Sequence, residues 1–269
     1  MKAQALFVRD GHAYLADPVC DGPWAEGALH GGAPAALLTH LLCAELDGTG
    51  LALARLTCEL LRPNPRGPLT PRIEIVRPGR RVTLLDGALV GPGEQVVTRA
   101  RALFVAPSDI DGSPEDDLPF PGPEEGEASD WKPAHRPMLP ADGMEIRFVE
   151  GRFSEPGPAT AWFRLRYDVL AGEETRPADR VAAAGDFGNG ISSVLSWQRH
   201  TFINPDLTIY LERPPVDEWI ALSSRMRVHA GSVAGAESVL YDRRGRIGHA
   251  TQSLLVASVG TPAPTGAAT

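Results

Sequence analysis

The sequence predicts an α+β fold built from two copies of one unit, each a long helix wrapped by an antiparallel sheet. Three observations predict it: an internal repeat, the same order of helix and strand patterns in both halves, and an acidic Pro-rich segment between the halves. The chain has 269 residues, of which 43% are hydrophobic. That is enough apolar surface for one large core or two fused smaller ones.

The internal repeat aligns two segments 151 residues apart. Residues 56–63 read LTCELLRP and residues 207–214 read LTIYLERP, and the two agree at five of eight positions. Residues 103–106 (LFVA) and 254–257 (LLVA) match at the same separation, with no gap needed. We infer a duplication, so the two halves are expected to share one fold.

The first half carries the pattern of one long helix followed by four strands. A helix is predicted over residues 30–47, because four leucines between positions 37 and 42 fall on one stripe. Pro34 is tolerated there because it lies in the first turn. Strands rich in Val, Leu and Thr are predicted at 51–61, 72–76, 81–90 and 95–106, after two short ones at 5–8 and 12–15.

The second half repeats this order. A helix is predicted over 181–197, and strands at 201–211, 218–229, 232–241 and 246–257, preceded by strands at 146–149 and 161–170. Each helix must bury its apolar stripe against a sheet face. Each unit alone would leave a sheet edge unpaired, so we expect the two edges to join into one continuous sheet.

These patterns give four segments: an N-terminal unit (1–106), a linker (107–143), a C-terminal unit (144–260) and a disordered tail (261–269). The linker holds eight prolines and ten acidic residues, with Lys132 and Arg136 as its bases. Such a composition predicts an irregular surface segment.

Charge and composition exclude several classes of function. The net charge of -8 disfavours nucleic acid as a partner. Cys20, Cys43 and Cys58 have no C-x-x-C spacing, which argues against a disulfide framework and a structural metal site. There is neither a signal-peptide pattern at the start nor an apolar run of membrane-spanning length. We therefore expect no membrane span and a cytoplasmic location.

Two regions resemble a known family. His30-Gly31-Gly32, opening the helix within residues 24–42, resembles the start of the central helix in hotdog-fold thioesterases. In the second half the resemblance is to double-hotdog acyl-CoA thioesterases of the bacterial thioesterase II type, and it is carried by Asp186-Phe187, Glu212-Arg213-Pro214, Asp217-Glu218-Trp219 and residues 245–256. The resemblance implies a double hotdog and an acyl-CoA substrate.

The resemblance also implies a reaction and its residues. A water held among an Asp, a hydroxyl or amide residue and a Gln hydrolyses the thioester, with no cofactor. These positions fall on Asp186, Asn204 and Gln252. The best-known relatives carry Thr in place of Asn204, and an amide can also donate to and accept from a water. Placing Gln252 requires a one-residue shift, with Ser253 as the alternative.

The negative charge that develops on the thioester carbonyl oxygen needs donors. Free N–H groups at the first turn of a helix supply them, so His30, Gly31 and Gly32 are the predicted oxyanion and substrate-binding residues. By analogy with single-hotdog relatives, the first half would give this site and the second half the acid. Two simpler interpretations stay open: that Asp186 only caps or precedes a helix, and that His30 is a packing residue.

Other functions and contacts stay open as well. A non-hydrolytic acyl-CoA or acyl-carrier binder of the same fold is the main alternative, since Asn204 departs from the family pattern. A hydratase ranks low because no His follows Asp186 within ten residues.

Exposed sheet faces predict a homo-oligomer. His40 is expected to face solvent or the helix dipole. The arginines of the first half would either meet the phosphates of coenzyme A or form a solvated rim (Arg62, Arg66, Arg72, Arg77, Arg80 and Arg81).

Overall fold

The computed structural model describes residues 5–108, 118–129, 131, 136–229 and 233–258. The predicted disordered tail and part of the predicted linker (109–117, 130 and 132–135) lie outside this range. Within the described residues, no helix has both the length and the apolar composition needed to cross a bilayer.

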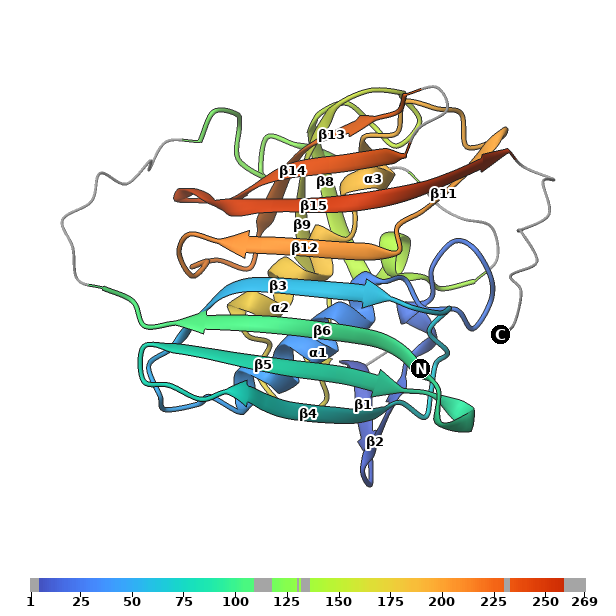
Figure 1. Cartoon of the computed structure of the whole chain (residues 1–269). Coiled ribbons are helices and arrows are strands. Elements are labelled where there is room, and N and C mark those ends of the chain that lie inside the picture. The colour runs from blue at the N-terminus through green and yellow to red at the C-terminus, as the bar shows by residue number, and fades with distance from the viewer. Residues whose placement is uncertain (1–4, 109–117, 130, 132–135, 230–232, 259–269) are drawn as a thin grey trace.

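One sheet of twelve strands runs through both halves (Figure 1). Its order is β4-β5-β6-β3-β12-β15-β14-β13-β9-β8-β7, and β11 pairs with β15. The first half supplies β3 (Ala52–Leu60), β4 (Thr70–Arg77), β5 (Val82–Val90) and β6 (Val96–Val105). The remaining strands are β7 (Glu127–Ala128), β8 (Met144–Glu150), β9 (Ala159–Leu165), β11 (His200–Ile203), β12 (Asp206–Leu211), β13 (Ile220–Arg227), β14 (Ala234–Asp242) and β15 (Gly245–Ser258).

A second, three-stranded sheet also joins the halves. Its strand β1 (Ala5–Asp10) lies between β2 (Ala13–Ala16) and β10 (Asp168–Leu170). The pairing of β1 with β10 is parallel, whereas β1 and β2 form an antiparallel hairpin. The halves are therefore held together by backbone pairing at two places.

The halves meet in the large sheet where β3 pairs with β12, and this pairing gives the continuous sheet that was expected. Thr57 lies opposite Thr208, and the two hydroxyl oxygens are 3.3 Å apart. These threonines are equivalent positions of the repeat. On either side, Glu59 pairs with Asp206 and Arg55 with Tyr210. The register is thus symmetric about Thr57 and Thr208, which places an approximate twofold axis between them.

The helices pack together on one face of the large sheet, where Figure 1 shows α1 and α2 side by side. Helix α1 (Gly32–Ala44) is buried on almost every side because it contacts β5, β6 and α2. The predicted second helix, 181–197, is wrong in its bounds. Helix α2 (Pro177–Gly185) starts earlier, and a short α3 (Gly188–Ile191) follows a break. Glycines at both sides of that break weaken helix continuation.

Two predicted strands are each divided in the structure. The predicted strand 201–211 is β11 and β12, separated by Asn204 and Pro205. Pro205 has no N–H to give to a strand ladder, so the pairing stops there. The break frees Asn204 from the ladder. The predicted strand 161–170 is likewise divided into β9 and β10.

The segment 107–143 is not irregular throughout. It contains β7 and a wide helical turn at Leu139–Gly143, and the Leu139 side chain is fully buried. The indole N–H of Trp162 donates to the carbonyl oxygen of Pro121, at 3.0 Å. The described part of this segment therefore packs against both halves, since the Leu139 N–H also donates to the carbonyl oxygen of Asp21 in the first half.

His40 lies between the helices and is buried, not solvent-facing as expected. Its Nδ1 is 2.8 Å from Asp179 Oδ2 and its Nε2 is 3.0 Å from Glu173 Oε2. Burial alone would lower the pKa of His40, but the hydrogen bonds with Asp179 and Glu173 outweigh it and raise that pKa. Burial also raises the pKa of Asp179. Both shifts mean that the folded chain holds protons here more tightly than the unfolded chain does.

We predict that this cluster makes the fold less stable at alkaline pH. A His with a raised pKa stabilises the fold fully below its unfolded value, and that contribution is lost as pH rises through its folded pKa. The free energy of unfolding, measured by denaturant titration between about pH 6 and pH 9, should fall, and H40Q should flatten the dependence. An H40Q variant with the same pH slope as the parent chain would contradict this assignment.

Candidate active site

The break after α2 positions the predicted acid. Asp186 is the C-cap residue of α2, so it follows the helix and does not lie within it. Its side chain is only 5% exposed. The next residue, Phe187, is also buried and packs on the ring of Phe163, with centroids 4.9 Å apart. The break therefore turns a carboxylate into the interior, where the two halves meet.

Asn204 and Gln252 both reach this carboxylate, although Asn204 directly precedes β12 and Gln252 lies in the neighbouring strand β15. Asn204 Nδ2 donates to Asp186 Oδ1 at 2.7 Å. Gln252 Nε2 is 3.4 Å from the same oxygen and 3.2 Å from the Asp186 carbonyl oxygen. Gln252 Oε1 accepts the N–H of Asn189 at 3.0 Å, which fixes the orientation of the amide. The three residues named from the sequence thus form one hydrogen-bonded group.

The choice between Gln252 and Ser253 follows from the alternation of β15. Gln252 is buried beneath the helices, whereas its neighbour Ser253 is exposed on the opposite face of the sheet. Successive side chains of a strand point to opposite faces. Only Gln252 of the two can therefore contact Asp186.

The first half contributes His30 and the two glycines. His30 Nδ1 is 3.1 Å from Asp186 Oδ2, and the imidazole stacks on Phe187 with ring centroids 4.4 Å apart. The Gly32 N–H donates to His30 Nδ1 at 3.2 Å. All six residues named from the sequence therefore lie at one junction between α1 and α2.

Both glycines allow close approach. A Cβ on Gly31 would lie 2.7 Å from Leu60 Cδ1 and 2.8 Å from Asp186 Oδ2. A Cβ on Gly32 would lie 2.4 Å from the backbone carbonyl oxygen of Ala183, in α2. Only glycine lets the start of α1 pack this closely on α2 and on the carboxylate. The Gly32 N–H already donates to His30 Nδ1 in this structure. It would have to leave that acceptor to serve as the predicted oxyanion donor.

Burial controls the protonation of the site. It raises the pKa of Asp186, and the nearby His30, Asn204, Gly32 N–H and Gln252 oppose that rise without cancelling it. Burial also lowers the pKa of His30, and the Asp186 charge only partly offsets this. A carboxyl with a raised pKa is a stronger base once ionised, and a His with a lowered pKa stays neutral near pH 7.

The group can accept a proton and orient a small polar molecule. A buried carboxylate, two amides and a neutral imidazole meet at one point, which is a suitable set for general base chemistry on water. Within the described part of the chain, no cluster of three or more His, Cys, Asp or Glu side chains is arranged to hold a metal ion.

Comparison with known proteins identifies the family. Residues 20–105 match the family model of the acyl-CoA thioesterase N-terminal domain, and residues 114–256 match that of the C-terminal domain. The chain belongs to the acyl-CoA thioesterase family. The resemblance found in the sequence is thus confirmed, and the chain is a thioesterase. The C-terminal match begins inside the predicted linker. No curated protein matches this chain.

Solved structures show the same fold at low sequence identity. A candidate thioesterase from Novosphingobium aromaticivorans is 21% identical, with a TM-score of 0.69 over 94% of this chain and 99% of that one. A hotdog-fold protein from Alicyclobacillus acidocaldarius is 16% identical, with a TM-score of 0.72 over 95% and 96%. An acyl-CoA thioesterase II from Mycobacterium marinum is 15% identical, with a TM-score of 0.62 over 95% of both chains. The α+β hotdog fold predicted from the sequence is confirmed.

Some contacts at this candidate site were not predicted. These are the hydrogen bond from the Asn189 N–H to Gln252 and the stacking of Phe187 on His30. The signal that was available is the run of glycines at 185, 188 and 190. A Cβ on Gly188 would lie 2.6 Å from Ser238 Oγ and 3.0 Å from Gln252 Oε1, so α3 must also approach the sheet closely.

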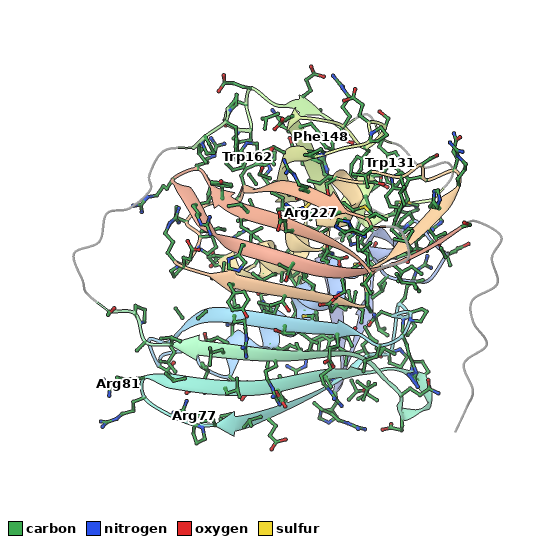
Figure 2. All side chains as sticks on the ribbon, turned by 45° about the horizontal axis from the view of Figure 1, so that its top comes forward. Arg77, Arg81, Trp131, Phe148, Trp162 and Arg227 are labelled. Carbon is green, nitrogen blue, oxygen red and sulfur yellow. The ribbon has the colours of Figure 1, made fainter. Side chains whose placement is uncertain are left out.

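The arginines of the first half do not form one cluster. Arg62 donates to Gln95, Arg66 forms an ion pair with the buried Asp21, and Arg72 forms one with Glu94. Arg77 and Arg81 project from the turn between β4 and β5, at the far edge of the sheet (Figure 2). These side chains fit the solvated rim better than a single phosphate site.

We predict that the two glycines differ in what they support. G32A should lower the free energy of unfolding by about 1–3 kcal/mol, because its methyl group would meet backbone in α2. G31A should cost less stability but most of the thioesterase activity, because its methyl group would meet the Asp186 carboxylate and the flexible end of Leu60. Denaturant titration and steady-state kinetics separate the two effects.

G190A is the matched control. The nearest atom to a Cβ on Gly190 is 4.0 Å away, on Phe153. Its stability should therefore equal or slightly exceed that of the parent chain. Equal losses of stability in all three variants would mean that close packing at the start of α1 is not what requires glycine.

Proposed function

We propose that the protein hydrolyses acyl-CoA thioesters with a water molecule activated by Asp186 and oriented by Asn204 and Gln252. One observation carries this proposal: two amides from the second half and an imidazole from the first half converge on a single buried carboxylate. The family supports the general reaction, thioester hydrolysis. The geometry supports these particular residues as its machinery.

The proposed reaction needs one proton acceptor. The Asp186 carboxylate takes a proton from water, and the resulting hydroxide attacks the thioester carbonyl carbon. The tetrahedral intermediate then expels the coenzyme A thiolate, which receives the proton, leaving the free acid. The two amides hold the water against the base and orient it towards the carbonyl. General base catalysis of this kind raises the rate by about 10²–10⁴.

We interpret the two halves as two hotdog units, a double hotdog with one active site. The approximate twofold axis would relate this junction to a second one at the other end of the helix pair. At the separation of the repeat, the positions equivalent to Asn204 and Gln252 are Leu53 and Arg101. Leu53 cannot bind water, and Arg101 forms an ion pair with Asp86. The polar set for water activation therefore occurs once.

We predict that D186N loses hydrolysis by about 10²–10⁴ in kcat, because Asn cannot accept the proton. Release of coenzyme A from acyl-CoA, followed with a thiol reagent, measures this. D86N is the matched control, since Asp86 is an ion-paired carboxylate far from the site, and it should keep full activity. Coenzyme A release at the parent rate by D186N would refute Asp186 as the base.

We also predict an acid limb in the pH profile of kcat/KM. Activity requires the Asp186 carboxylate, so the rate falls as pH drops through its raised pKa. Asn204 donates to that carboxylate and lowers its pKa, so N204A should move the limb to higher pH, whereas N204T, which keeps a donor, should leave it nearly unchanged. An acid limb at the same pH in N204A would contradict this role.

The alternative is a non-hydrolytic binder of acyl-CoA or acyl carriers. It predicts tight binding with no release of coenzyme A from the parent chain, so the same assay separates the two functions. The homo-oligomeric state and cytoplasmic location expected from the sequence stay predictions.

A further inference from the structure

The candidate base is closed off in this structure. The side chain of Asp186 is 5% exposed and that of His30 is 12% exposed. Gly31 and Leu60 cover the carboxylate, as the contacts of a Cβ at Gly31 demonstrate. A thioester carbonyl must come within about 3–3.5 Å of the attacking water. Some part of the cover must therefore move before a substrate can react.

Two loops lie next to residues of the site in the chain. The first, residues 22–28, is closed by the Gly22 N–H donating to the Ala28 carbonyl oxygen at 2.8 Å, and His30 follows it. In Figure 1 it is the blue loop at the end of the sheet where β3 ends and β12 begins. The second, residues 192–199, runs from α3 to β11, so it lies between Asp186 and Asn204 in the chain. Because of these short chain connections, a movement of either loop would also displace His30 or Asn204.

A pair of tryptophans joins these loops across the two halves. The rings of Trp24 and Trp197 have centroids 5.7 Å apart and are tilted by 40°. Trp197 also packs edge-on against the buried Phe202, at 4.6 Å, two residues before Asn204. In the described part of the chain, Trp24 has no other ring contact. Trp197 is thus held by its own half and contacts Trp24 of the other half.

Both indoles leave much apolar surface in water. Trp24 is 50% exposed and Trp197 is 38% exposed. Val194, on the second loop, is a further exposed apolar side chain. Covering apolar surface is favourable by about 25 cal/mol per Å². An acyl chain matches this surface, and the phosphates of coenzyme A do not.

We propose that Trp24 and Trp197 form a gate over the Asp186 site and that, once the gate opens, both indoles bind the acyl chain of the substrate. The gate sets acyl-chain selectivity, because a short acyl group reaches the carboxylate without covering the indoles, whereas a long one lies against both. This inference rests on the proposed function for the site that the gate covers.

Binding and turnover are measured separately to test it. The probes are two non-hydrolysable thioethers, dodecyl-CoA and ethyl-CoA, with Kd from calorimetry. W24A and W197A should each weaken dodecyl-CoA binding about tenfold, equivalent to about 1.4 kcal/mol, and leave ethyl-CoA binding within about twofold. W24F should recover most of the loss, since a smaller ring still covers the chain.

Y210A is the matched control, because Tyr210 is an aromatic residue of similar exposure, 41%, stacked on His249 on the outer face of the sheet. It should bind both thioethers as the parent chain does. In W24A and W197A, the KM for dodecanoyl-CoA hydrolysis should rise, and the KM for acetyl-CoA hydrolysis should stay close to that of the parent chain.

Several outcomes overturn the gate. Equal losses for both thioethers mean that the indoles do not read the acyl chain. Unchanged binding with a change in oligomeric state, measured by light scattering, means that the indoles belong to an interface between copies. The proposed chemistry fails independently: D186N should bind dodecyl-CoA as tightly as the parent chain, so loss of hydrolysis with intact binding concerns Asp186 and not the gate.

Discussion

The pairing of β3 with β12 is the constraint on which the rest of the structure depends. Because Thr57 and Thr208 face each other, every other strand of one half has a fixed position relative to the other half. The helices lie on one face of the sheet that results, each over strands of its own half, and they pack against each other. The start of α1 must then meet the end of α2, and the end of α1 must meet the start of α2. Both helix contacts are consequences of one strand register.

The two ends of the helix pair each hold a His–Asp pair, and the pKa of the His is shifted in opposite directions at the two ends. At each end a buried His of the first half faces a buried Asp of the second: His30 with Asp186, and His40 with Asp179. At the Asp179 end, the carboxylate also accepts the Arg176 N–H, and the pKa of His40 is raised. A hydrogen-bonded His–Asp pair there connects the halves. At the Asp186 end burial outweighs the partners, and the pKa of His30 is lowered.

The repeat and the strand periodicity predicted most of the strands and the joining of the two halves into one sheet, because both depend on short local patterns in the sequence. The break at Asp186 was harder to predict. Each of the glycines at 185, 188 and 190 lowers helix stability by about 1 kcal/mol. This loss does not indicate whether the helix bends, ends or continues. The burial of His40 could not be predicted at all, because its partners lie more than 130 residues away.

The six site residues were placed from the family resemblance, and physical reasons explain why they converge. A buried carboxylate is costly unless donors surround it. No single strand or helix offers Asp186 enough of them. Asn204 is available because Pro205 interrupts the ladder, Gln252 because strand alternation turns it inward, and the Gly32 N–H because glycines let α1 approach. These donors hold the pKa of Asp186 lower than burial alone would, yet it stays raised. A carboxyl with a raised pKa is, once ionised, a stronger base towards water than an ordinary carboxylate.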